Sequence, residues 1–129
     1  MRAVDTNVLV RFFVADNPAQ FRRAQKVFES GALFIPKTVL LEASWILRSA
    51  FGMSDTEILH AFGALAAAAE VEIEDFDTVQ TALAWFADGM DFADALHLAS
   101  KGGAVEFLTF DKRLVASARN AGVKGVVQP

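Results

Sequence analysis

The chain has 129 residues, a length that fits one domain with one hydrophobic core, so we expect a single domain over residues 1–129. It contains no cysteine, which excludes disulfides, thiolate metal sites and a cysteine nucleophile, so any metal must be held by oxygen or histidine. The net charge of −4 argues against a general basic surface for nucleic acid, so contact with a polyanion must be local or helped by a metal.

The first half of the chain predicts strands that alternate with helices. Asn17-Pro18 signals a break between two helices, Gly31 closes the second, and Thr38 is the expected N-cap of the next. The expected elements are a strand ending at residue 4, helices over 8–14 and 19–30, a strand over 32–35 and a helix over about 38–51.

The second half repeats this alternation. Ser54 can cap a helix, and Gly89 and Gly122 each stop one. The expected elements are helices over 55–69, 77–86, 92–100 and 112–120 and strands over 71–73, 106–110 and 125–127. Alternation over the whole length predicts an α/β fold, a three-layer α/β/α sandwich with a mostly parallel central sheet.

Four carboxylates lie at predicted helix starts. Asp5, Asp91 and Asp111 each directly precede a helix, so each is explained on its own as an N-cap. Asp94 follows Asp91 by three residues and can interact with first-turn amides and the helix dipole. Taken singly, these acids do not require a functional explanation.

Glu42 does not fit that explanation, because it lies inside a predicted helix. It shares a face with Val39 and Ile46 at three- and four-residue spacing, and we expect that face to turn inward. A carboxylate in a core is costly unless it is paired, with Arg48 or Lys37 as possible mates, or binds a metal. The pattern therefore predicts a functional Glu42.

Together the acids indicate a metal site. Asp5 and Asp111 end two parallel strands, and the helices that begin near Thr38 and Asp91 start from the same sheet edge, so several carboxylates are expected in one crevice. Their repulsion would favour protonation unless a divalent cation neutralised them. Oxygen ligands suit Mg²⁺ or Mn²⁺, and such a site suits phosphodiester hydrolysis.

Part of the basic set lies near the same crevice. For each basic residue in this set, a solvated surface charge is an equally good explanation. The candidates for contact with a phosphate backbone are Arg11, Lys37, Lys112 and Arg113.

At this point the residues carry a family resemblance. Several segments, in this order and spacing over nearly the whole chain, resemble the signature segments of PIN domains, and more closely those of the VapC toxins of bacterial and archaeal toxin–antitoxin pairs. The segments are Val4-Asp5-Thr6-Asn7-Val8-Leu9, Leu41-Glu42, Asp91-Phe92-Ala93-Asp94-Ala95-Leu96-His97-Leu98-Ala99 and Leu108-Thr109-Phe110-Asp111-Lys112-Arg113-Leu114.

The resemblance implies a Mg²⁺- or Mn²⁺-dependent endoribonuclease, usually dimeric, that a co-produced VapB-type antitoxin holds inactive. By position it implies a catalytic quartet of Asp5, Glu42, Asp94 and Asp111. Asp5, Asp94 and Asp111 would hold the metal. The implied supporting residues are Thr6, Asn7 and Thr109. Asp91 matches a frequent acid of the family, but we assign it a supporting role as the N-cap of the helix that aims Asp94.

Other side chains receive a structural interpretation. His97 lies one turn after Asp94, but a lone histidine on a half-apolar helix more often packs or faces solvent, and His60 has no acidic neighbours in sequence. Trp45 and Trp85 recur with the phenylalanines at helical spacing, which predicts core and interface positions rather than base-stacking platforms.

Two alternative functions stay open. One is an aspartate-based phosphatase or phosphotransferase with Asp5 as nucleophile, although such enzymes usually carry a second aspartate where this chain has Asn7. The other is a non-catalytic interaction domain, in which the acids are only caps and the apolar surplus forms a partner surface.

The apolar content bears on partners and location. Hydrophobic residues make up 53% of the chain and the mean hydropathy is +0.33, so we expect a homodimer or a tight partner to cover apolar surface. No apolar stretch reaches the ~20 residues of a membrane span, and the start lacks signal-peptide features, so we expect a soluble, cytoplasmic protein.

Overall fold

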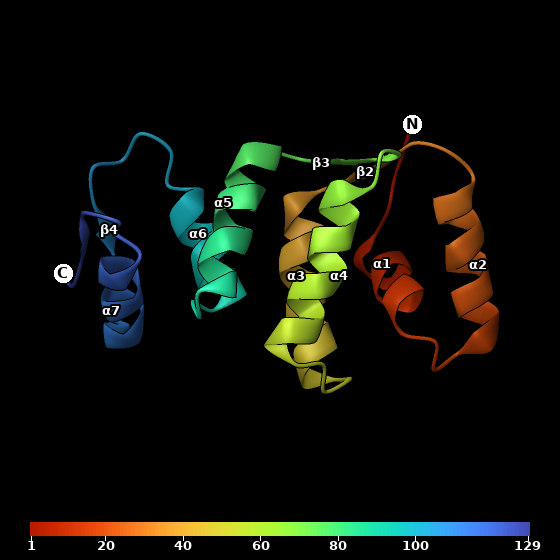
Figure 1. Cartoon of the computed structure of the whole chain (residues 1–129), viewed down its shortest axis with the longest axis horizontal. Helices are drawn as coiled ribbons and strands as arrows, with labels where there is room; N and C mark the ends of the chain where they lie inside the picture. Colours follow the sequence, from red (N-terminus) through yellow and green to blue (C-terminus); the bar gives the residue numbers. More distant parts are fainter. The chain divides into compact units, whose positions relative to one another are not determined.

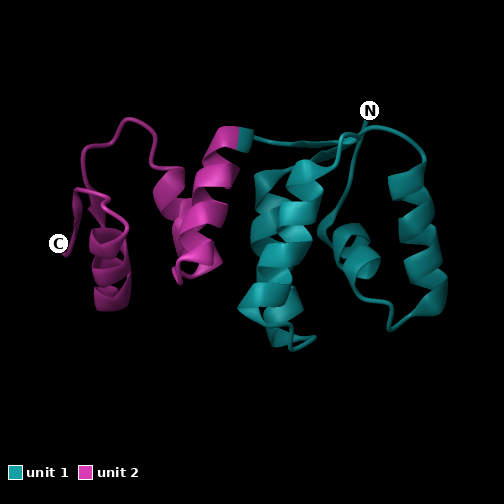
Figure 2. Ribbon diagram, in the orientation of Figure 1, with its two compact units in different colours: residues 1–76 teal, residues 77–129 magenta.

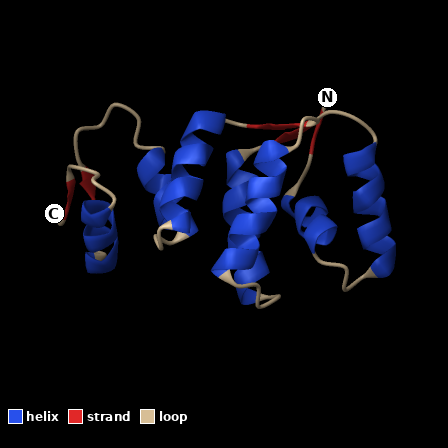
Figure 3. Cartoon of the chain, viewed as in Figure 1, coloured by secondary structure: helices blue, strands red, loops and turns tan.

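The computed structural model describes all residues 1–129, with seven helices and five short strands (Figures 1 and 3). In chain order the elements are β1 Arg2–Ala3, α1 Thr6–Phe13, α2 Pro18–Glu29, β2 Leu33–Ile35, α3 Lys37–Ser49, α4 Asp55–Ala67, β3 Val71–Ile73, α5 Phe76–Ala87, α6 Phe92–Ala99, β4 Phe107–Leu108, α7 Lys112–Asn120 and β5 Val126–Val127. Every predicted helix and strand is present, so the alternating pattern is confirmed. No helix is long and apolar enough to cross a membrane.

The chain divides into two compact units, residues 1–76 and 77–129 (Figure 2). In the first unit β1, β2 and β3 form a parallel sheet in that order, with Ala3 opposite Phe34 and Ile35 opposite Ile73. In the second unit β4 and β5 pair in parallel, with Leu108 opposite Val127. Every strand pair is parallel, as predicted. That both units belong to one domain stays a prediction.

The three strands of the first unit bring polar residues to one edge of their sheet. Because the strands are parallel, the residues that follow them emerge at the same edge. Asp5 comes two residues after β1, Lys37 two residues after β2, and Glu74 and Asp75 directly after β3. The helices α1 and α3 begin at this edge and pack against each other.

Aromatic and aliphatic side chains fix the helices of the first unit. The rings of Phe12 on α1 and Phe28 on α2 stack with centroids 4.0 Å apart. The rings of Phe13 on α1 and Phe62 on α4 are tilted to each other, with centroids 6.3 Å apart. Leu9, on α1 with Phe12 and Phe13, is fully buried. The helix that Asp5 begins is therefore held by two neighbours, which gives its first turn a defined position.

The second unit has its own buried residues. Phe86 of α5 and Phe92 of α6 meet edge to face with ring centroids 5.5 Å apart. Phe92 is fully buried, and Leu114 of α7 is nearly so. The burial of Phe92 restricts the start of α6, and the burial of Leu114 restricts the start of α7. These two helix starts carry the acids Asp91, Asp94 and Asp111.

One local prediction is wrong, and another is narrowed. Thr38 does not cap α3, because Pro36 already has φ −61° and the helix begins at Lys37. The free amide of Lys37 is instead satisfied by Glu74, whose Oε1 accepts it at 3.0 Å. Trp45 does not lie in the core, since 71% of it is exposed, and its expected interface position stays a prediction. The predicted Ser54 cap is confirmed, and it forms a capping box with Glu57.

A glycine substitution tests the approach between β5 and the segment before β4. Gly125 has φ +81°, and a methyl group there would overlap the backbone carbonyl oxygen of Val105. We expect Gly125→Ala to lower the free energy of unfolding by about 3 kcal/mol, from the left-handed backbone and the overlap together. Gly122 has a similar φ of +76° with open space around it, so Gly122→Ala should cost only about 1 kcal/mol. Equal losses in urea unfolding would contradict the close approach.

Candidate active site

Asp5 is the N-cap of α1. Its Oδ1 accepts the backbone N–H of Thr6 at 2.7 Å, while the carboxylate stays exposed to solvent. Thr6 is buried, with 4% of its surface exposed, so the first turn of α1 is anchored directly behind the acid. Asn7 is exposed on the same turn. The backbone bond fixes Asp5 in orientation and leaves it open to a ligand from solvent.

The burial expected of Glu42 is wrong. Residues Leu40, Ala43 and Leu47 form the fully buried stripe of α3, and Glu42 lies outside it and is exposed. Apolar residues of this helix also lie outside that stripe, so spacing alone allowed two inward faces, and packing against α1 and α4 buries the face without the acid. No burial cost therefore demands a metal at Glu42, and its catalytic role rests on the resemblance alone.

Two acids of the second unit are also helix caps. Oδ2 of Asp91 accepts the N–H of Asp94 at 3.1 Å. Oδ1 of Asp111 accepts the N–H groups of Arg113 and Leu114 at 2.9 and 3.2 Å. The hydroxyl oxygen of Thr109 accepts the Asp111 N–H at 3.0 Å, which fixes the backbone of that acid. The predicted capping of all three acids is thus confirmed.

Asp94 differs from these caps. Its side chain is half-buried, and the structure gives its carboxylate no hydrogen bond from the protein. Burial raises the pKa of Asp94, and the negative charges of Asp91 and Asp111 raise it further. The positive charges of His97 and Arg113 act in the opposite direction. The second unit thus brings three carboxylates close enough to repel one another, with Asp94 the least stabilised.

The donor set fits a hard divalent cation. Three aspartates from two helix starts offer only oxygen, as Mg²⁺ and Mn²⁺ prefer, and a cation would relieve the repulsion that raises the pKa of Asp94. Neither unit by itself gathers three acidic or histidine side chains into a ready-formed ion site. The residues therefore suit a metal in chemistry, whereas the geometry of chelation is not preformed.

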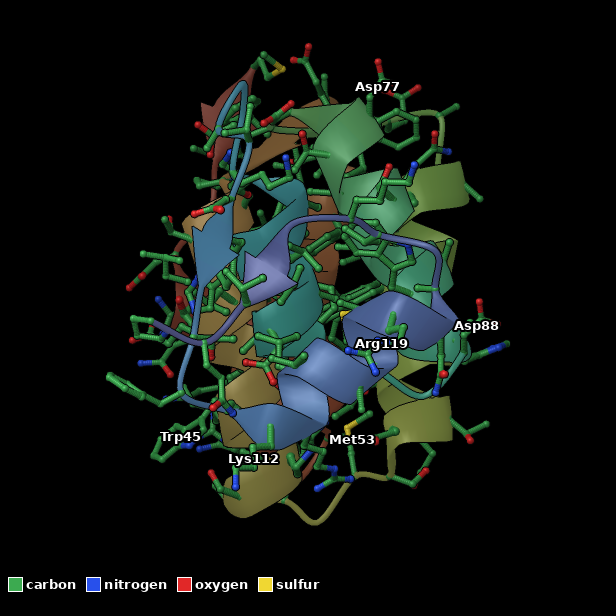
Figure 4. All side chains as sticks on the ribbon, turned by 90° about the vertical axis from the view of Figure 1, so that its left-hand side faces the viewer. Trp45, Met53, Asp77, Asp88, Lys112 and Arg119 are labelled. Atoms are coloured by element: carbon green, nitrogen blue, oxygen red, sulfur yellow. The ribbon has the colours of Figure 1, made fainter.

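The predicted basic residues fall into two groups. Arg11 and Lys37 are ion-paired, with Asp16 at 2.6 Å and with Asp75 at 2.9 Å. Lys112 and Arg113 are exposed on the first turn of α7, and Figure 4 shows the Lys112 side chain reaching outward from that helix. Of the four, only Arg113 acts electrostatically on Asp94.

Sequence reasoning missed the residues that position Lys37. Glu74 accepts its backbone N–H and Asp75 binds its ammonium group, and both follow β3 at the edge where Asp5 also lies. The signal was present, since Glu74-Asp75 directly follow a predicted strand, as Asp5 and Asp111 do. Among the acids that follow predicted strands, Asp5 and Asp111 were considered as site residues, whereas Glu74 and Asp75 were not.

Parallel strands that end in aspartates at helix starts define an α/β protein with an acidic site. The model of the PIN domain matches residues 2–120, so the chain belongs to the PIN-domain family and has its α/β fold. Among solved structures, VapC20 of Mycobacterium tuberculosis, described as a toxin that cleaves the sarcin–ricin loop, is 23% identical over 100% of both chains, with a TM-score of 0.47. A comparison with curated proteins found no match.

The raised pKa of Asp94 predicts how its removal changes stability with pH. Ionised Asp94 is disfavoured in the folded state, so its ionisation lowers the free energy of unfolding. This loss is absent below about pH 3, where the acid is protonated in both states. It grows as the pH rises from the unfolded-state pKa to the folded-state pKa, and it is complete above both. Asn resembles the protonated acid. Asp94→Asn in EDTA should therefore raise Tm by a few degrees at neutral pH, and this gain should vanish towards pH 3.

The matched control for this experiment is Asp88→Asn, which removes one negative charge from the end of α5. Figure 4 shows Asp88 at the margin of the second unit. Its effect measures the contribution of net charge. A Tm gain for Asp94→Asn no larger than that of Asp88→Asn, or one that persists unchanged at pH 3, would contradict the repulsion among the three aspartates.

Proposed function

We propose that this PIN-domain protein is a metal-dependent endoribonuclease of the VapC type. It hydrolyses RNA phosphodiester bonds with Mg²⁺ or Mn²⁺ as its cofactor, and it acts in the cytoplasm. The observation that carries the proposal is the unfavourable environment of the Asp94 carboxylate. Capping accounts for Asp5, Asp91 and Asp111, but Asp94 caps nothing, is half-buried and is repelled by two neighbouring acids.

An unfavourable charge that serves no structural purpose is typical of functional sites. A domain that used its acids only as caps would have no reason to keep Asp94 ionised beside Asp91 and Asp111, because a neutral residue there would be more stable. This favours the nuclease over the interaction domain. The phosphatase alternative gains no support, since Asn7 still occupies the place of its second aspartate.

The roles follow from the local geometry. A bound Mg²⁺ or Mn²⁺ would help ionise a water molecule and offset charge on the scissile phosphate. Asp94 and Asp111 would supply ligand oxygens on elements fixed by capping bonds, and Asp91 holds the first turn beneath Asp94. We assign a phosphate contact to Arg113, and the support is that its charge acts on Asp94. Asp5 and Glu42 are assigned to the catalytic acids from the family resemblance.

The first experiment is cleavage of total cellular RNA by the purified protein. We expect discrete cuts with Mg²⁺ or Mn²⁺ and none with EDTA. Asp5→Asn and Asp94→Asn should each lower the cleavage rate about 100-fold or more, because each removes a group that acts on the reacting atoms. Asp88→Asn should cleave as the wild type does.

A second readout in the same variants separates binding from catalysis. A ligand at 100 times its Kd that binds only the folded state stabilises it by about 2.7 kcal/mol, so Mn²⁺ should raise the Tm of the wild type. The gain should be lost in Asp94→Asn and kept in Asp88→Asn. Cuts that survive EDTA, or an unchanged Mn²⁺ response in Asp94→Asn, would contradict the proposed site.

We further propose that the protein forms a homodimer and that a VapB-type antitoxin binds it. The support is the apolar content of 53% and several exposed hydrophobic side chains, among them Phe110 at 83% and Leu108 at 57%. Light scattering on the purified chain at rising concentration should give twice the 14.0 kDa monomer mass. A strict monomer throughout would contradict the dimer.

A further inference from the structure

The first unit contains a cavity of about 320 Å³ between α1 and α2. Asn7, Val8 and Arg11 line it from one face of α1, and the α2 side consists of residues 20, 23, 24 and 27, which also share a face at helical spacing. The cavity begins two residues after Asp5, on the turn that this acid caps. All of its lining residues belong to the first unit.

The lining of the cavity combines apolar side chains that are buried or half-buried with polar side chains that are mostly exposed. Val8, Ala24 and Val27 supply the apolar part, and the side-chain amides of Asn7 and Gln20 offer both donors and acceptors. No acidic residue lines the cavity. In a chain of net charge −4 this is a local site for an anion with an apolar part.

The two arginines of the cavity differ in their partners. Arg11 is fixed, with Asp16 at 2.6 Å and the ring of Phe51 beneath its guanidinium at 5.7 Å. Arg23 takes part in none of the ion pairs of the structure and is exposed. The cavity thus has one preorganised guanidinium plane and one guanidinium whose charge is open to a ligand.

These features match a single nucleotide. A guanidinium fork binds phosphate, guanidinium planes and apolar side chains contact a base or ribose, and side-chain amides bond the edge of a base. The volume lies at the low end of the roughly 300–1,000 Å³ of small-ligand sites. An acidic peptide would bind the arginines, but its carboxylates would make no use of the side-chain amides of Asn7 and Gln20 or of the apolar part of the lining.

We infer that this cavity is a nucleotide-binding subsite that holds one nucleotide of the RNA substrate beside Asp5, with Arg23 as its phosphate contact. The inference rests on the proposed endoribonuclease function, because the substrate strand is what would extend from Asp5 into the cavity. It adds a specificity-determining pocket to that function. Asn7 and Gln20 would then decide which base is accepted.

The test uses the four nucleoside 5′-monophosphates as probes on the full chain in EDTA, so that no metal bridges phosphate to the acids. Binding is followed by NMR through the Nε–H signals of Arg11 and Arg23 and the side-chain amides of Asn7 and Gln20. We expect saturable shifts in this set with a Kd on the order of 1 mM for the preferred nucleotide. Inorganic phosphate alone should bind more weakly.

Neighbouring arginines on α2 give a matched pair of variants. Arg23→Gln should weaken nucleotide binding about tenfold, as expected for loss of a charge-assisted hydrogen bond. Arg22→Gln removes the same charge one residue away, outside the cavity lining, and should change the Kd less than about twofold. Because both positions are exposed, neither variant is expected to disturb the fold.

Equal effects of the two variants, shifts scattered over the surface, or phosphate binding as tight as nucleotide binding would each overturn the subsite. So would a penta-aspartate peptide that shifts these signals while no nucleotide does, since that outcome assigns the cavity to an acidic protein partner. The result is separable from the nuclease itself: metal-dependent RNA cleavage with no nucleotide binding here rejects only the subsite, and nucleotide binding without cleavage rejects only the nuclease.

Discussion

The acceptance of backbone N–H groups by aspartates at helix starts is the interaction on which this site depends. Asp5, Asp91 and Asp111 each bind a first-turn amide through one carboxylate oxygen. Such a bond stabilises the helix and also fixes the direction of the carboxylate. In each case buried residues on the same helix hold the turn in place. A structural interaction thereby orients a reactive group, which is why the capping and functional explanations of these acids do not compete.

Asp94 shows what capping leaves unexplained. It lies three residues into the helix that Asp91 caps, where the helix dipole favours a negative charge, and yet burial and two neighbouring carboxylates outweigh that benefit and raise its pKa. A group in this state gains more from an approaching cation than a solvated surface acid does. The second unit therefore concentrates its affinity for positive charge at one side chain.

The sequence predicted the elements well because they are set locally. Alternating apolar runs, capping aspartates and glycine stops act over a few residues, so the helix over 112–120 agrees with the structure at both ends. The errors arose where distant segments decide. Glu74, directly after β3, accepts the backbone N–H of Lys37 at the start of α3, where a Thr38 cap was expected. The packing of α3 against α1 and α4 leaves Glu42 and Trp45 exposed, although the helix also carries apolar residues outside its buried stripe. The candidate site was predictable for the caps and for Thr109, whereas Arg23 and Gln20 carry no signal until α2 is placed against α1.

A protein of net negative charge can bind a polyanion only if basic side chains lie at the place where the phosphates bind. Of the basic residues singled out here, Arg11, Lys37 and Arg48 are already paired with aspartates, so their fields are largely cancelled at a distance. Lys112 and Arg113 at the start of α7 and Arg23 in the α1–α2 cavity take part in none of these ion pairs and remain able to meet phosphate. Binding through so few contacts releases few counterions, so affinity should depend only weakly on salt and selectivity must come from shape and base contacts. If the proposed RNA substrate is correct, such a surface would disfavour retention of bulk nucleic acid and favour selective binding of one RNA segment.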